Sequence, residues 1–286
     1  MSDHDDDAAA ADWTTWTGRS STSTAHLHPD QANRMAVTLD RPPTFVAGQA
    51  LPPAWHWLYF HDFVESSRLG PDGHPARGIV MPPVPLERRM WAAGDLRFHE
   101  PLRLGETATR VSTISDITAK SGRSGPLYFV TVEHELRVGD RLAVAETQKI
   151  VYRELTAETG GAAAPAPVDP EFSRTWQFAS TALFRYSALT FNSHRIHYDV
   201  EYARDVEGYP GLVVHGPLLA TLLADLAESQ GDRLAALDYR ARSPLFSPDA
   251  FTVNGRRAGT AATLWATSGS GSLAMEATAT YRQEAQ

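Results

Sequence analysis

The most regular apolar pattern in the sequence lies in "HGPLLATLLADLAESQ", residues 215–230. Its leucines form one broad face at helical spacing, which predicts a long buried helix. An earlier helix is predicted in "HPDQANRMAVTLD", residues 28–40, with Asp30 as its N-cap. There the apolar side chains follow at i, i+3, i+4 and i+7; they are Ala32, Met35, Ala36 and Leu39.

Runs that are typical of strands follow each of these helices. Part of residues 127–138 alternates with a period of two, as expected for a strand with one buried face. Gly-containing turns separate several of the runs. The expected strands are residues 95–102, 107–117, 127–138 and 142–154, and then 238–246, 250–257, 262–268 and 272–283.

The order of one helix and about four strands therefore occurs twice. "PLRLGE" (101–106) and "PLFSPD" (244–249) share Pro-Leu and an acidic residue four positions beyond the leucine, which favours an internal duplication. The small, Pro-rich residues 156–170 are interpreted as a linker, and residues 1–27 as a disordered acidic tail. The prediction is an α+β fold of two units, residues 28–155 and 171–286, each a sheet wrapped around a long helix.

Composition narrows the function classes. The formal net charge of −8 argues against nonspecific nucleic-acid binding, which needs basic surfaces. No run approaches the ~20 apolar residues of a membrane span, so no membrane association is expected. The chain has no cysteine, which excludes disulfides, zinc–thiolate sites and a cysteine nucleophile, and fits a cytoplasmic location.

Polar and titratable residues crowd into "FNSHRIHYD", residues 191–199, directly behind an apolar run. One interpretation is a solvated helix start with Asn192 or Ser193 as N-cap. A second is a metal site in which His215 joins His194 and His197, although the sequence lacks an HExxH motif. A third is general acid–base chemistry, because imidazole titrates near neutral pH and a nearby carboxamide can hold water. The N–H groups of the helix that begins at 215–216 would then stabilise an oxyanion, which suits the addition of water to a polarised double bond.

"FNSHRIHYDVEYA…GYPGLVVHGPLLATLL" resembles the MaoC-like hydratases, the (R)-specific enoyl-CoA hydratase group. Their motif, Asp-x-Asn-Pro-(Leu/Ile/Val)-His, places its histidine on His197. Asn192, His194 and Arg195 then stand where the motif has aspartate, asparagine and proline. "RRMWAAGDLRFHEPLRLGE" and "KIVYRE" add a resemblance to the subgroup of mesaconyl-C4-CoA hydratases and mitochondrial-type 3-hydroxyacyl-thioester dehydratases. Arg88, Arg89 and Trp91 belong to this signature without an assigned chemical role.

The resemblance implies a double hot-dog fold and a reversible hydro-lyase that acts on an α,β-unsaturated acyl-CoA. The catalytic unit would be the C-terminal one, while the N-terminal unit would be structural and would shape the acyl groove. The thioester itself is the electron sink, so no metal or redox cofactor is expected. The implied catalytic residues are His197, Asn192, His194 and Gly216, the last through its backbone N–H, and the expected substrate contacts are Arg195, His215 and Tyr186.

Three features of these assignments stay open. Asn192 cannot accept a proton, so His197 is the main acid–base candidate and His194 a second one. Arg195 would bind the free carboxylate of a dicarboxylic acyl-CoA; its alternatives are a pair with Asp199 and a contact with a CoA phosphate. Tyr186, on an expected strand, has core packing as its alternative.

Three other functions fit the same fold. They are a 3-hydroxyacyl-[acyl-carrier-protein] dehydratase, a hot-dog thioesterase and a non-catalytic acyl-CoA-binding protein. A thioesterase of this fold commonly uses a carboxylate base, which Asn192 cannot supply. A homodimer that covers the outer sheet edges is an option for the quaternary structure.

Overall fold

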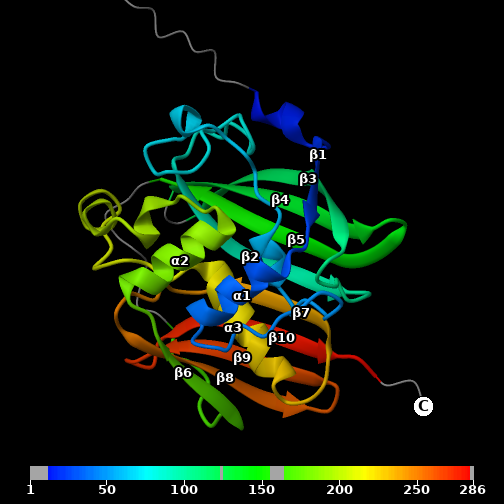
Figure 1. The fold of residues 1–286 in the computed structure, drawn as a ribbon. Helices are drawn as coiled ribbons and strands as arrows, with labels where there is room; N and C mark the ends of the chain where they lie inside the picture. Colours follow the sequence, from blue (N-terminus) through cyan, green and yellow to red (C-terminus); the bar gives the residue numbers. More distant parts are fainter. Residues whose placement is uncertain (1–11, 123–124, 155–163, 284–286) are drawn as a thin grey trace, which may run out of the picture.

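The computed structural model describes residues 12–122, 125–154 and 164–283. Its strands form one antiparallel sheet in the order β1-β3-β4-β5-β2-β7-β10-β9-β8-β6. Figure 1 shows the cyan and green strands of the N-terminal unit and the orange and red strands of the C-terminal unit as two parts of this sheet. The α+β class predicted from the sequence is confirmed.

Each unit contributes five strands in the same relative order. The N-terminal strands are β1 (Ser20–His26), β2 (Arg88–Phe98), β3 (Thr107–Gly122), β4 (Gly125–Val138) and β5 (Arg141–Arg153). The C-terminal strands are β6 (Phe172–Gln177), β7 (Leu234–Ala241), β8 (Ala250–Ala258), β9 (Ala261–Ser268) and β10 (Leu273–Tyr281). The two units join where β2 pairs with β7, from Ala93↔Arg240 to Arg97↔Ala236.

Three α-helices accompany this sheet in the described residues: α1 (Pro29–Thr38), α2 (Ser180–Thr190) and α3 (Gly216–Glu228). Helix α3 packs on all four strands β7 to β10 and on β2, and the five leucines of its apolar face are buried. Helix α1 packs against α2. Burying these faces in one apolar cluster supplies the main driving force for the fold.

Matching hydrogen bonds confirm the internal duplication. The N–H of Leu51 donates to Leu102 O at 2.7 Å in the N-terminal unit, and the N–H of Val214 donates to Leu245 O at 2.8 Å in the C-terminal unit. The two acceptors lie in the paired sequences "PLRLGE" and "PLFSPD". Counting forward from the donors aligns Pro53 with Gly216, the first residue of α3.

The helix predicted at residues 28–40 is confirmed as α1, although its N-cap is His28 and not Asp30. However, α1 does not occupy the position in the N-terminal unit that α3 has in the C-terminal one. In the N-terminal unit the segment aligned with α3 forms only a 3₁₀ turn, Trp55–Leu58. Pro52 and Pro53 are followed by Ala54 in the left-handed region at φ +66°, a conformation that interrupts a helix. Helix α1 follows edge strand β1 as α2 follows edge strand β6, so α1 is the counterpart of α2.

The N-terminal tail is more ordered than its composition suggests. The prediction of disorder for residues 1–27 is wrong for the described part, because a 3₁₀ turn (Trp13–Trp16) leads into β1, which pairs with β3 along its whole length. Ser and Thr offer little apolar surface, but the backbone bonds of an edge strand do not require it. Residues 1–11 and most of the predicted linker, 156–163, lie outside the described residues.

Tyr186 lies on α2 and not on the expected strand. Leu183, Tyr186 and Ser187 are buried at helical spacing, a pattern too short to separate from a strand by sequence. No helix among the described residues is long and apolar enough to cross a membrane.

Candidate active site

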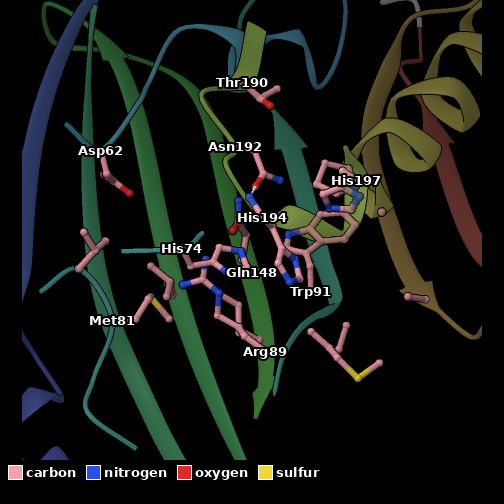
Figure 2. Close-up of a pocket in the computed structure, with 18 of the residues that line it drawn as sticks. Asp62, His74, Met81, Arg89, Trp91, Gln148, Thr190, Asn192, His194 and His197 are labelled. Carbon is pink, nitrogen blue, oxygen red and sulfur yellow. Dashed lines mark hydrogen bonds between the residues drawn. The ribbon is translucent and has the colours of Figure 1, made fainter. Parts of the chain in front are cut away.

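A cavity of about 710 Å³ is lined by residues of both units. The N-terminal unit contributes His74 from the loop before β2, Arg89 and Trp91 from β2, and Gln148 from β5. The C-terminal unit contributes Asn192, His194, His197 and Gly216, so the cavity joins the predicted motif to side chains from the other half of the chain. Figure 2 shows His74, Arg89, Gln148 and His194 gathered in the middle, with Trp91 and His197 to one side.

His197 ends the short 3₁₀ turn Arg195–His197 and is buried in the wall of the cavity. Its Nδ1 lies 2.8 Å from Val213 O, and since a carbonyl only accepts, Nδ1 carries the proton. Burial, together with the charge of the neighbouring His194, lowers the pKa of His197 to about 3. The ring is therefore neutral at neutral pH, with the lone pair on Nε2.

His215 and Tyr186 support His197 from behind. The His215 ring stacks on the His197 ring with centroids 3.7 Å apart, and its Nε2 lies 2.8 Å from Ser187 Oγ. Tyr186 meets the edge of the His215 ring at 4.8 Å. Neither His215 nor Tyr186 lines the cavity, so the prediction that they contact substrate is wrong. They fix the orientation of the His197 ring.

Asn192 follows Phe191, a left-handed residue (φ +53°) that ends α2. The Asn192 Oδ1 accepts the backbone N–H of His194 at 3.0 Å. This bond leaves the Nδ2 group, a donor, for the cavity. Asn192 can therefore bind an oxygen of water or substrate, but it cannot accept a proton.

His194 is oriented by a buried ion pair that spans the two units. Its Nε2 lies 3.3 Å from Glu207 Oε1, and Glu207 Oε2 lies 3.2 Å from the Nε of Arg88 on β2. The Arg88 guanidinium also stacks over Tyr209. Because His194 and His197 are 6% and 7% exposed, the alternative of a solvated helix start is wrong.

An Asp–His pair that the sequence did not reveal faces the same histidines. His74 Nδ1 lies 2.8 Å from Asp72 Oδ2, and the His74 ring overlaps that of His194 with centroids 4.1 Å apart. Burial and the positive charge of Arg89 lower the pKa of His74 well below its usual value. Burial alone would raise the Asp72 pKa, but the hydrogen bonds and charge of His74 outweigh it and lower that pKa to about 2.

Glycine at position 73 allows this loop to reach the motif. The N–H of Arg195 donates to Asp72 O at 2.9 Å, and Ser193 Oγ donates to Gly73 O. Gly73 has φ +89°, and a Cβ there would lie 1.9 Å from Ser193 O. Only glycine fits such a conformation and such a close approach.

Gly216 brings the start of α3 to the cavity. It is the first helical residue, so its N–H has no acceptor within the helix, and Pro217 next to it has no N–H at all. A Cβ on Gly216 would lie 2.9 Å from Cε3 of Trp91. The absence of a side chain therefore lets Trp91 pack against the helix start.

Arg195 does not enter the cavity. Its Nε and Nη2 donate to Asp199 Oδ2 at 3.0 and 2.8 Å, Nη1 donates to Pro71 O, and the guanidinium stacks on Tyr202. The predicted grip of Arg195 on a substrate carboxylate is wrong, and of its alternatives the pair with Asp199 is confirmed.

The side chains that could ligate a metal are not those of the predicted alternative. His197 and His215 stack face to face and do not converge on a point. Asp72, His74 and His194 bring three ligand atoms within 4.8 Å of one another. Their Asp–His bond and overlapping rings already account for this proximity.

A neutral buried histidine beside a free helix N-terminus, in a cavity shared by two duplicated α+β units, defines the class of double hot-dog hydratases and dehydratases. The family model of hydroxyacyl-thioester dehydratase type 2 matches residues 54–247, and the chain belongs to this family. The mesaconyl-C4-CoA hydratase of Chloroflexus aurantiacus is 45% identical over 94% of this chain and 98% of its own length. The mitochondrial hydroxyacyl-thioester dehydratase type 2 of Schizosaccharomyces pombe is 30% identical over 69% of this chain and 75% of its own length.

Solved structures confirm the predicted double hot-dog architecture. A MaoC-like dehydratase from Phytophthora capsici superimposes with a TM-score of 0.70 at 17% identity, covering 94% of this chain and 97% of its own. A double hot-dog protein of Mycobacterium tuberculosis superimposes with a TM-score of 0.58 at 12% identity, covering 93% and 96%.

Proposed function

We propose that this protein is a hydro-lyase that adds water to the double bond of an α,β-unsaturated acyl-CoA, and that this acyl group carries a free carboxylate in addition to the thioester. The observation that carries the proposal is the pairing, in one cavity, of neutral His197 with the unbonded N–H at the start of α3. One group takes a proton and the other stabilises an oxyanion, which are the two tasks that hydration of a thioester-conjugated double bond requires.

In the hydration direction, His197 Nε2 removes a proton from water as the water oxygen bonds to the β-carbon. The electron pair of the double bond moves to the α-carbon and the thioester oxygen, where the N–H of Gly216 stabilises the enolate. The proton on Nε2 then passes to the α-carbon. The net change is one hydrogen at the α-carbon and one hydroxyl at the β-carbon, and dehydration follows the same steps in reverse.

The other side chains have positioning roles in this proposal. Asn192 donates from Nδ2 to the attacking water, since its Oδ1 is engaged by the backbone of His194. His194, tied to Glu207, supports the proton transfer as a neighbour of His197, with ring centroids 5.5 Å apart. The thioester carbonyl accepts the electron pair, so the proposed reaction uses no cofactor besides the CoA of its substrate.

The relative in Chloroflexus aurantiacus supports the dicarboxylic substrate, because its name specifies mesaconyl-C4-CoA and it matches nearly the whole chain. In that substrate the β-carbon carries a methyl group and a free carboxylate. Hydration at this carbon needs a cavity that accepts both an apolar group and a negative charge. The cavity offers apolar side chains such as Met81 and Ile150 and a basic one in Arg89.

A paired assay tests the proposal. Mesaconyl-C4-CoA and crotonyl-CoA are each followed by the ultraviolet loss of the conjugated thioester, with free thiol measured in parallel. Turnover of mesaconyl-C4-CoA without thiol release is expected. Turnover of crotonyl-CoA alone would contradict the dicarboxylic substrate, and thiol release would assign the protein to the thioesterases.

We also propose that the protein forms a homodimer through an outer edge of its sheet. Strands β1 and β6 end the sheet and are mostly exposed, and an unpaired strand edge favours association. Light scattering after size-exclusion chromatography would give twice the 31.3 kDa chain mass if this is correct.

A further inference from the structure

Arg89 brings a positive charge to the wall of the cavity. It lies on β2, half-buried, and no ion pair with a carboxylate is found for it among the described residues. Its neighbours are His74, whose pKa is lowered by the Arg89 charge, and Tyr152, whose hydroxyl oxygen accepts a hydrogen bond from Arg89. A guanidinium removed from bulk water without a counter-charge is costly, and an anionic ligand would offset that cost.

The other arginines of the cavity differ from Arg89. Arg110 pairs with Asp62 at 3.2 Å, and Arg242 pairs with Glu276. Arg19 is exposed and stacks on Trp16 with its guanidinium 4.2 Å from the ring centroid. Adjacent Arg88 is committed to Glu207. Among the described cavity residues, Arg89 is thus the inward-facing arginine whose guanidinium has no carboxylate partner.

The position of Arg89 also fits the chemistry. Its charge acts on His74, whose ring contacts that of His194, and His194 in turn lies next to His197. Figure 2 shows the Arg89 side chain extending into the cavity toward His74. In mesaconyl-C4-CoA the carboxylate is bonded to the very carbon that takes up water, so its binding group must lie close to the proton-transfer residue.

We propose that the Arg89 guanidinium binds the free carboxylate of the acyl group and thereby selects β-carboxylated enoyl-CoA substrates. The inference rests on the proposed function and names the residue that determines its specificity. A planar guanidinium can bind a carboxylate through two parallel hydrogen bonds, which fixes the orientation of the β-carbon as well as its charge. Because His74 is neutral, it adds no second positive charge beside Arg89.

The test is a binding experiment that does not depend on turnover. Succinyl-CoA and butyryl-CoA are saturated analogues that differ by a carboxylate in place of a methyl group at the position that Arg89 would bind. Their dissociation constants are measured by calorimetry with the wild type, Arg89→Gln and Arg89→Met. The wild type is expected to prefer succinyl-CoA by about 10- to 100-fold, and both variants to lose that preference.

Arg19→Gln is the matched control, because it removes the same charge from the cavity rim and should leave the ratio of the two constants unchanged. An unchanged ratio in a folded Arg89 variant, or a wild type that prefers butyryl-CoA, would overturn the inference. A wild type that prefers succinyl-CoA but hydrates no enoyl-CoA would refute the proposed function and leave the carboxylate site in place.

Discussion

A general base must be unprotonated and correctly oriented, and the surroundings of His197 provide both conditions. Val213 O fixes the proton on Nδ1, and the stacked ring of His215 fixes the plane. Ser187 in turn holds His215. The residue proposed to transfer the proton is thus oriented in part by His215 and Ser187, which do not line the cavity.

Replacing His197 with alanine should lower kcat by about 10²- to 10⁴-fold, the usual contribution of a general base. The thermal melt should show that the variant folds. His99→Ala, an exposed histidine outside the cavity, is the control and should retain full activity. A His197→Ala enzyme within tenfold of the wild-type kcat would mean that another group takes the proton.

Strand β2 contributes to the site at several points of its length. Arg88 anchors Glu207, Arg89 faces the cavity, and Trp91 packs against the first residue of α3. The register of β2 against β5 shifts between Trp91 and Ala93, and beyond this irregularity the strand pairs with β7. Strand β2 therefore both joins the two units, through its pairing with β7, and positions the start of α3, through Trp91.

Gly216→Ala should reduce kcat by about 10- to 100-fold, because its Cβ would lie 2.9 Å from Trp91 and push the helix start, with its N–H, away from the thioester oxygen. Combining it with Trp91→Leu removes the crowded ring and should restore part of the activity. The kinetics of both single variants and the double variant measure this coupling. No rescue would indicate that Trp91 does not limit the position of α3.

Breaking the buried ion pair between Arg88 and Glu207 should lower the stability of the protein and, separately, its catalytic rate. Arg88→Met removes the guanidinium that pairs with buried Glu207, which should lower the free energy of unfolding by about 3–5 kcal/mol. Adding Glu207→Leu should recover most of that loss in urea titrations, while kcat stays low because His194 has lost its partner. Full activity in the double variant would refute a role for Glu207 in orienting His194.

The elements that sequence predicted well are those with a repeating apolar pattern. The leucine face of α3 and the alternation of β4 are local signals, and both are confirmed. Strand β1 was missed because its Ser and Thr side chains carry no such pattern. Asp72 and His74 were missed because only the folded chain brings their loop to a motif about 120 residues away.

At the scale of the whole molecule, burial holds a group of histidines in the neutral form. Burial lowers the pKa of four deeply buried ones, His74, His134, His197 and His215. In the unfolded chain their pKa would be about 6.5. Below that pH the unfolded state binds protons that the folded state does not, so stability is complete above about pH 7 and falls as the pH decreases.

Urea unfolding at several pH values between 7.5 and 5 should therefore show a steep loss of stability. Each of the four histidines adds up to about 1.4 kcal/mol per pH unit to the slope. A variant that retains the fold but lacks one of them, such as His134→Gln, should show a shallower slope. A stability that is flat across this range would mean that these histidines are protonated in the folded protein.

The alignment of Pro53 with Gly216 bears on how many substrates one chain can process. Proline has no N–H to offer, and the turn that follows it is too short to present a helix end. The N-terminal unit therefore has no equivalent of the backbone N–H that is proposed to bind the thioester oxygen, and a tight-binding analogue should titrate at one equivalent per chain.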